Sequence, residues 1–532
     1  MIEDRRRFMA GVVASLAGAA SGLTVRPGFA TATASPRSST KGSAGPRRAA
    51  FELALRRQDA TQASNGDEVA LPSFLAAYTK CLPHSDSGLV DQAAYRVYLE
   101  AIESRSAESF ERIPLGGFVK LANPQAAFAT DLVGPSPTQV ACPPAPRFAS
   151  AEQAGELVEL YWKAHLRDLA FAEYESSPLA ARAARELSAL SDFRGPKRGG
   201  VVSARTIFRG TTDGDLEGPY LSQFLLLPIP MRPLVVEQRI RTVVPSRSYL
   251  TEFAPWLAIQ NGQIAGVASY DPQPRYIRNG RDLAEYVNRD FTYQAFLGAC
   301  LLSLRLGALP DGGSPYKHSR TQSAFVTFGQ PFLLSLVALA SQVALTACWY
   351  QKWVVHRRLR PEEYAGRVEA QLAGRASFPL PSELLDSDAL AEARRWNGTA
   401  LLSQVYPEGA PTHPSYPAGH AVIAGACATV LKACLDETHV VPAPVEASED
   451  GLKLTPYRGA PLTIGGELDK LASNIALGRD FAGVHWRSDG AAGLELGEMV
   501  AIELLRELRL TGNELFAGYS LRKFDGTQVR VG

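Results

Sequence analysis

The chain has 532 residues, with 55 Lys and Arg against 54 Asp and Glu, which gives a formal net charge of +1. Hydrophobic residues make up 46% and charged residues 20% of the chain, so the composition is that of a folded globular protein and not of a disordered one. A near-zero net charge argues against a nucleic-acid-binding protein. Six cysteines are too few for a scaffold built on disulfides in a chain of this length.

Residues 1–34 have the features of an export signal. Arg5, Arg6 and Arg7 precede Phe8, a short Ala- and Gly-rich apolar stretch follows, and two Ala-x-Ala cleavage sites close the segment. This arrangement resembles a bacterial twin-arginine signal, which exports folded proteins, so we expect a periplasmic or extracellular protein. Residues 35–50, rich in Ser, Pro, Gly and Arg, are predicted to form a flexible spacer.

Helical periodicity dominates the rest of the chain and predicts a mostly α protein with few short strands. We expect an N-terminal helical region over residues 51–320 and a C-terminal helical bundle over residues 321–532. The segments predicted as helices are 151–175, 180–190, 282–306, 330–355, 419–436, 465–477 and 490–508, and those predicted as strands are 240–244 and 256–260.

The longest apolar run, residues 332–350, is long enough to span a membrane. It is interrupted by Ser, Gln and Thr and no second span accompanies it, so a buried central helix fits better. The mature chain is therefore predicted to have no membrane span.

A first motif-like segment runs from Lys352 to Tyr364 and reads KWVVHRRLRPEEY. Pro361 disfavours helical geometry at the residue before it, so a helix should end at Arg360, about 80° around the helix from Lys352. The cations between them are equally typical of a solvated helix face.

A second segment, residues 412–433, is a Pro- and Gly-rich loop that feeds into an apolar helix near Gly419. Backbone amides at a helix start favour a bound anion, and His413 and His420 flank this turn. The same pattern also fits an ordinary helix cap.

A third segment, residues 477–490, contains Arg479, His485 and Asp489. An arginine offers a planar fork of donors to an oxyanion, and Asp489 is placed to orient His485 by accepting its second ring proton.

The order Lys-x7-Arg-Pro, Pro-x-Gly-His and Arg-x5-His-x3-Asp resembles the oxyanion site shared by vanadium-dependent haloperoxidases and the type 2 phosphatidic acid phosphatase superfamily. The first spacing is one residue longer than the usual phosphatase form and is similar to that of the bromoperoxidases. The sequence resembles that of the bromoperoxidases over roughly residues 205–510.

The resemblance implies a vanadate cofactor. Lys352, Arg360 and Arg479 would bind its equatorial oxygens, the Gly419 amide would add a donor, and His485 would be the axial ligand of vanadium.

The resemblance also assigns His420 as the acid–base residue and His413 as the extra histidine typical of bromoperoxidases. Trp353 and Tyr416 lie beside these ligands in the sequence and either line the halide pocket or serve as packing. In this family the loop reads Pro-Ser-Gly-His, whereas Ala418 here lacks the hydroxyl donor.

The implied activity is oxidation of halide by hydrogen peroxide to a hypohalous species that halogenates a small organic acceptor, with bromide and iodide favoured over chloride because of His413. The rival functions are an acid phosphatase with a phospho-His485 intermediate and a non-catalytic oxyanion-binding relative. A halogenase dedicated to one bound organic substrate also stays open.

Three further expectations concern a carboxylate, a pair of cysteines and assembly. Asp290 is predicted to be a surface carboxylate in preference to a partner of the site. A disulfide between Cys81 and Cys142 is an alternative to free thiols in an exported protein. The resemblance leaves room for a homo-oligomer.

Overall fold

The computed structural model describes residues 44–532, so the predicted signal and residues 35–43 of the spacer lie outside the described residues. The end of the predicted spacer is helical, because helix α2 covers Ala44–Arg56. Its Ala, Arg, Glu and Leu residues are strong helix formers and outweigh the single Gly and Pro of its first turn, where Pro is tolerated.

Residues Pro46–Gly532 form one compact unit, so both predicted regions lie within it. The described residues contain seventeen α-helices, α2 to α18, and six short strands, which confirms the mostly α fold class. The helices that build the site and its support are α6 (Ala151–Leu166), α10 (Gly280–Arg289), α11 (Gln294–Arg305), α12 (Gln330–Tyr350), α13 (Pro361–Leu372), α16 (Gly419–Cys434), α17 (Ile464–Phe481) and α18 (Arg487–Thr511).

The remaining helices lie around these. They are α3 (Asp67–Ala70), α4 (Gln92–Ser104), α5 (Ala107–Glu111), α7 (Pro178–Ala189), α8 (Asp213–Leu216), α9 (Phe253–Gln260), α14 (Ser382–Leu385) and α15 (Asp388–Asn397). The strands form three antiparallel hairpins: β1 (Ile229–Met231) with β2 (Leu234–Val236), β3 (Val445–Ala447) with β4 (Leu454–Pro456), and β5 (Tyr519–Arg522) with β6 (Gln528–Val531).

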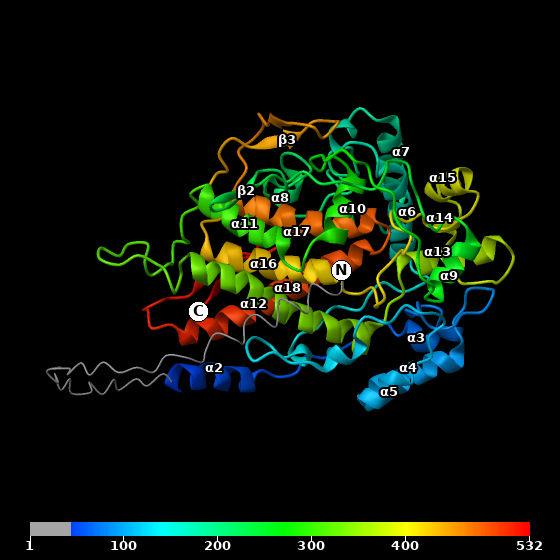
Figure 1. Ribbon diagram of the computed structural model, residues 1–532, viewed down its shortest axis with the longest axis horizontal. Helices are drawn as coiled ribbons and strands as arrows, with labels where there is room; N and C mark the ends of the chain where they lie inside the picture. The colour runs from blue at the N-terminus through cyan, green and yellow to red at the C-terminus, as the bar shows by residue number, and fades with distance from the viewer. Residues whose placement is uncertain (1–43) are drawn as a thin grey trace, which may run out of the picture. The chain divides into compact units, whose positions relative to one another are not determined.

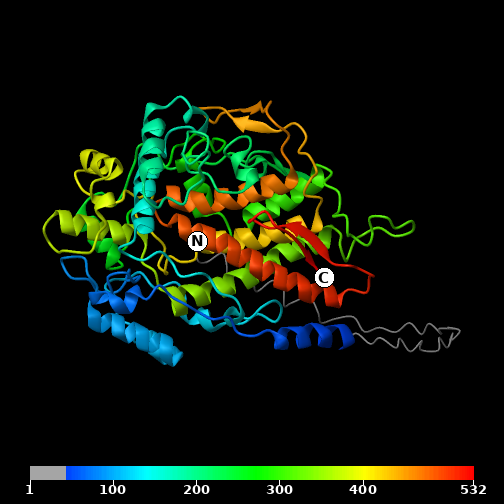
Figure 2. The ribbon, with the colours of Figure 1, turned by 180° about the vertical axis from the view of Figure 1, so that it is seen from behind.

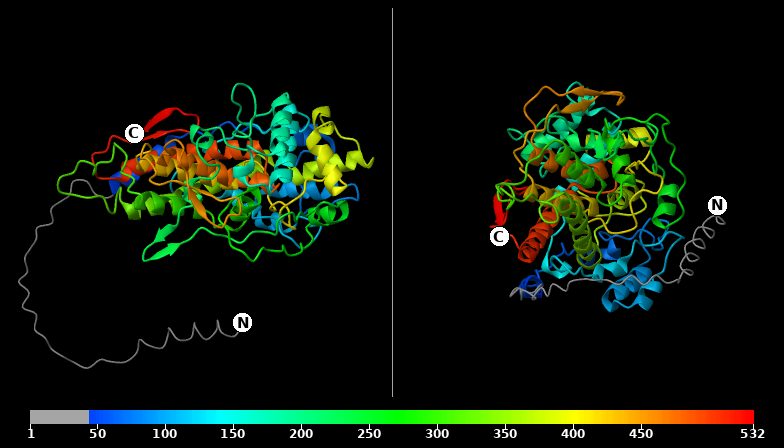
Figure 3. Two further views of the ribbon diagram at one scale, coloured as in Figure 1. Left: turned by 90° about the horizontal axis from the view of Figure 1, so that it is seen from above. Right: turned by 60° about the vertical axis from the view of Figure 1, so that its left-hand side comes forward.

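Helices α12, α16, α17 and α18 run side by side through the centre of the unit (Figures 1 and 2), and α16 packs mainly on α18 and α12. Glycines permit the close approach of α16 and α18. A Cβ atom at Gly497 would lie 2.0 Å from the carbonyl oxygen of Val422, and one at Gly425 would lie 2.2 Å from that of Leu494. The hairpins stay at the margin, as the β3–β4 hairpin does in Figure 3.

The apolar run predicted as a central helix forms α12. Together with the turn that follows it, Gln330–His356, it is the one described helix long and apolar enough to cross a membrane. Of its most apolar window, 56% is buried inside the fold. Such burial is typical of a core helix.

Three predictions about secondary structure were wrong. The single helix expected over 282–306 is two helices, α10 and α11, because Asp290 is extended (φ −63°, ψ 150°). The predicted strand 256–260 is the end of helix α9, since a short apolar run does not distinguish strand from helix. Residues 240–244 make only isolated bridges, Ile240 to Arg275 and Val243 to Tyr270.

Cys81 and Cys142 are both free thiols, and both are buried. The disulfide alternative is therefore wrong for this structure. Burial raises the pKa of both thiols, that of Cys81 to about 11.

Candidate active site

The first motif does not lie on one continuous helix. A π-helical turn, Gln351–His356, follows α12, and Arg357 then adopts the left-handed conformation (φ 39°), which ends the helix. Arg360 is the N-cap residue of α13, with Pro361 at its first position, where a missing N–H costs nothing. The expected 80° relation between Lys352 and Arg360 on one helix was therefore wrong. The break lets both side chains point into the same part of the bundle.

Three cations of the predicted site are buried. The exposed fractions of Lys352, Arg360 and Arg479 are 0%, 0% and 4%. Lys352 Nζ donates to the carbonyl oxygens of Pro414 and Ser415, each at 2.8 Å.

Arg360 donates to the carbonyl oxygens of His413 and Val484, and Arg479 Nη1 donates to that of Val287. Arg479 Nε is buried and has no hydrogen-bond partner in residues 44–532. Within those residues, none of the three charged side chains donates to a carboxylate oxygen. Buried charges in this state favour a bound anion, because an unpaired charge is costly to bury.

His485 joins these cations. Its Nδ1 lies 2.8 Å from Asp489 Oδ2, and its Nε2 lies 2.8 Å from Arg360 Nη1. Burial, and then the nearby cations Arg360 and Lys352, lower the pKa of His485 well below its ordinary value, so the ring is neutral. A proton on Nδ1 facing Asp489 leaves a lone pair on Nε2, which accepts from Arg360 and points toward the cations.

Asp489 is held more firmly than the sequence indicated. Its Oδ2 accepts from His485 Nδ1, from the backbone amide of Trp486 and from the hydroxyl of Ser415, and its Oδ1 accepts from Arg358 Nη1 at 2.9 Å. The exposed fraction of Arg358 is 3%. The alternative that this run of cations is a solvated face is therefore wrong for Arg358 and Arg360.

The start of α16 brings the second motif to the same place. Gly419 is the first residue of the helix and Ala418 its N-cap, without a side-chain cap. The Ala418 amide donates to the carbonyl oxygen of Asp489 at 2.9 Å, which ties this turn to the third motif. The methyl group of Ala418 packs in a small apolar cluster with Ala421 and Ala476.

His420 pairs with Asp290, which was predicted to be a surface carboxylate. Its Nε2 lies 3.2 Å from Asp290 Oδ1, and the side-chain exposed fractions are 32% for His420 and 6% for Asp290. Asp290 was misjudged because one continuous helix was expected there. The break between α10 and α11 turns its carboxylate toward α16.

His413 lies between Arg360 and an unpredicted aromatic residue. Its Nδ1 is 3.0 Å from Arg360 Nη2, and the ring centroid of Trp349 is 4.9 Å away. Burial, with Lys352 and Arg360, lowers the pKa of His413 well below its ordinary value. Trp349 lies one helical turn before Trp353. None of the three motifs predicted Trp349 as a site residue.

Trp353 and Tyr416 act as packing. The ring of Trp353 is fully buried and lies 6.0 Å from those of Tyr78 and Tyr98. Tyr416 donates to the carbonyl oxygen of Pro143 at 2.7 Å. Both rings therefore make packing contacts, and their place in a halide pocket stays a prediction.

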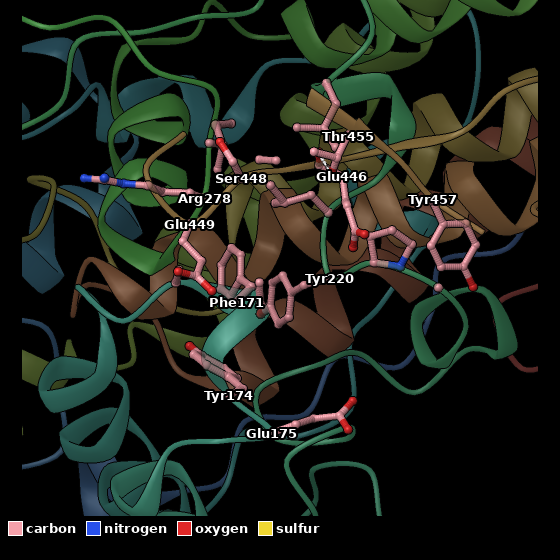
Figure 4. Close-up of a pocket in the computed structure, with 18 of the residues that line it drawn as sticks. Phe171, Tyr174, Glu175, Tyr220, Arg278, Glu446, Ser448, Glu449, Thr455 and Tyr457 are labelled. Atoms are coloured by element: carbon pink, nitrogen blue, oxygen red, sulfur yellow. Dashed lines mark hydrogen bonds between the residues drawn. The ribbon is translucent and has the colours of Figure 1, made fainter. Parts of the chain in front are cut away.

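The structure also contains a cavity of about 950 Å³ beside the β3–β4 hairpin (Figure 4). The rings of Phe171 and Tyr220 stack 3.8 Å apart on its wall. Arg205, which pairs with Glu175, also lines it. A second cavity of about 1010 Å³ lies along α18. Neither of these two cavities is lined by Lys352, Arg360, Arg479 or His485.

Comparison with known proteins identifies the family. The chain is 34% identical to the vanadium-dependent bromoperoxidase of Corallina pilulifera, over 93% of this chain and 99% of that protein. It is 36% identical to the vanadium-dependent bromoperoxidase of Ascophyllum nodosum, over 88% of this chain and 89% of that protein. The chain belongs to the vanadium-dependent haloperoxidases. This haloperoxidase is therefore a peroxidase-class oxidoreductase.

Two further comparisons agree. The family profile described as "VCPO second helical-bundle domain" matches residues 332–511 of this haloperoxidase. The structure of the second vanadate-dependent bromoperoxidase of Ascophyllum nodosum superposes with a TM-score of 0.87 at 29% identity, over 99% of this chain and 95% of that chain. The relatives imply a vanadate cofactor.

Proposed function

We propose that Lys352, Arg360 and Arg479 hold vanadate, with His485 Nε2 as its ligand. One observation carries this proposal: three buried cations have no carboxylate partner among the described residues, and a neutral imidazole directs a lone pair at them. An oxyanion with two or three negative charges supplies the missing partner. The N–H groups of lysine and arginine form charge-assisted hydrogen bonds with the oxygens of such an anion.

When bound, vanadate supplies a Lewis acid that polarises the O–O bond of hydrogen peroxide for attack by halide. The side chains of Lys352, Arg360 and Arg479 balance the charge of the oxyanion. Asp489 keeps His485 in the tautomer that carries its proton on Nδ1. His420, partly exposed and paired with Asp290, moves the protons that peroxide binding and release require.

We propose hypohalous acid as the product. Peroxide accepts two electrons from the halide, one proton is consumed, and water leaves together with the hypohalous acid, which halogenates a small organic acceptor. His413, held by Arg360 beside Trp349, supports bromide and iodide as the preferred halides over chloride.

The test is bromination of monochlorodimedone by the protein from about residue 34, with hydrogen peroxide and with or without orthovanadate. Vanadate-dependent bromination that His485→Ala abolishes is expected, with a weaker signal in chloride. Phosphate-ester hydrolysis without halogenation would contradict the proposal and favour the phosphatase. Silence in both assays would favour the oxyanion-binding relative.

We also propose a homo-oligomer, supported by the homohexameric structure described for the Ascophyllum neighbour. Strand β2 exposes Leu234 and Val235, each at 67%. Light scattering of the wild type and of Leu234→Asp with Val235→Asp tests this: a mass of 57.3 kDa for the wild type would contradict it.

Export through the twin-arginine route remains our proposal for location. It is supported by Arg5, Arg6 and Phe8 in the sequence. Changing Arg5, Arg6 and Arg7 to Lys should retain the protein inside a bacterial host, and unchanged export would contradict the proposal.

A further inference from the structure

Arg358 lies directly behind the proposed vanadium ligand and bridges two buried carboxylates. Its Nη1 donates to Asp489 Oδ1 and its Nη2 to Glu156 Oε2, both at 2.9 Å. The same two nitrogens also donate to Ser488 Oγ at 2.8 Å and Gln153 Oε1 at 2.7 Å. The guanidinium thereby links α6 to the first turn of α18.

This bridge fixes the Oδ1 side of Asp489, while the Trp486 amide and the Ser415 hydroxyl donate to Oδ2. Because Arg358 holds Oδ1, the carboxylate cannot rotate about its Cβ–Cγ bond without breaking a charge-assisted hydrogen bond. Oδ2 therefore stays opposite His485 Nδ1, 2.8 Å away. Glu156 balances the charge of Arg358 from the other side, so Asp489 does not have to neutralise it alone.

We propose that Arg358 is a positioning residue for the cofactor: by holding Asp489, it makes His485 present the Nε2 lone pair to vanadate. This inference rests on the proposed function. It concerns the bond from the imidazole to vanadium and not the general attraction of the pocket for anions, which Lys352, Arg360 and Arg479 supply.

The same helix junction provides a matched control. Arg487 is also buried, with an exposed fraction of 8%, and its guanidinium pairs with both carboxylate oxygens of Glu159, so it too joins α6 to α18. Its side chain also donates to the carbonyl oxygen of Arg209. Loss of Arg487 removes a similar buried ion pair and leaves the contacts of Asp489 in place.

The experiment compares two oxyanions by isothermal titration of the full-length protein, freed of metal and anion. Vanadate requires the imidazole lone pair, whereas inorganic phosphate is held by the cations alone. In Arg358→Met we expect vanadate affinity to fall about 10- to 100-fold while phosphate affinity is unchanged. Arg487→Met should leave both affinities unchanged, and Arg358→Lys should recover part of the vanadate affinity.

Equal losses for vanadate and phosphate in Arg358→Met, or an unchanged vanadate affinity, would overturn the inference. A wild type that binds phosphate but not vanadate would overturn the proposed function and this inference with it. Failure of the proposed function is thus seen in the wild type, whereas failure of the inference alone is seen only in the variant. If Arg358→Met does not fold, Glu156→Gln provides the same comparison, since it loosens Arg358 without removing it. Melting curves of each variant identify that case.

Discussion

The carboxylate of Asp489, in the first turn of α18, accepts a hydrogen bond from His485 Nδ1 at 2.8 Å and so fixes which nitrogen of the imidazole carries the proton. The other nitrogen then has a lone pair for a ligand. Since both residues are buried, water cannot replace this contact.

Asp489→Asn should therefore weaken vanadate binding about 10- to 100-fold, because an amide can donate to Nδ1 and favour the wrong tautomer. Equilibrium dialysis with vanadium detected by elemental analysis measures the loss. Ser415→Ala is the control: it removes one of the donors to the same carboxylate and should have a smaller effect. An equal loss in both variants would contradict the tautomer argument.

Lys352 makes anion binding depend on pH. Burial lowers its pKa to about 7, and Arg360 and Arg479 act in the same direction. A bound anion favours the charged amine, so binding above pH 7 should take up a proton and affinity should fall as the pH rises. Titration calorimetry of phosphate in two buffers of different ionisation enthalpy measures the uptake.

In Lys352→Met, proton uptake above pH 7 should disappear; uptake equal to that of the wild type would assign it to another group.

The stability of the anion-free protein should depend on pH in the opposite direction from its anion affinity. Between about pH 7 and the ordinary lysine value the unfolded chain binds more protons than the folded one, so this group makes the anion-free protein more stable as the pH rises through that window. Melting temperatures of the wild type and the variant should converge toward alkaline pH.

Asp290 should affect turnover and not cofactor binding. Asp290→Asn replaces a carboxylate with an amide beside His420, and we expect the rate at saturating vanadate to fall by about tenfold or more. Vanadate affinity should stay near that of the wild type. His420→Ala should lose about 100-fold or more, as expected for an acid–base residue. A loss of vanadate affinity equal to the loss of rate would assign Asp290 to the binding site.

Ala418→Ser tests the departure from the family loop. Ala418 is the N-cap of α16 and makes no side-chain cap, so a hydroxyl there should stabilise the protein by about 0.5–2 kcal/mol. Thermal and denaturant unfolding check this. If the hydroxyl instead reaches the anion, vanadate affinity rises without a gain in stability, and the wild type must lack a donor there.

Free thiols give a chemical check on the fold. All six cysteines are free and five are buried. A thiol reagent should therefore find six thiols after unfolding without reductant and almost none before it. A loss of two thiols from that count would indicate one disulfide and contradict the structure.

The three motifs could be found from the sequence because each combines residue types that one chemistry needs at a short, fixed spacing. Lys352 and Arg360 belong to one such segment, and His485 and Asp489 to another. Their meeting in space was inferred from a family resemblance, since no local pattern specifies which loops of a helical bundle come together.

Asp290 and Arg358 could not be assigned in this way. The first depends on a single extended residue that interrupts an otherwise helical pattern, and the second lies in a run of cations that usually faces solvent. What decides each case is a partner far away in the sequence, His420 or Glu156. A charged side chain that is buried because a distant carboxylate pairs with it leaves no periodic pattern in the sequence.

The segment that matches the helical-bundle family, residues 332–511, does not contain all the residues that hold its site side chains in place. Glu156 and Asp290 come from outside it, and Lys80 reaches in to pair with Glu362 at 2.6 Å. An excised bundle would therefore lack the carboxylates behind Arg358 and His420. Vanadate would then bind more tightly to chains whose distant halves have assembled, and mass action would draw the population toward that state.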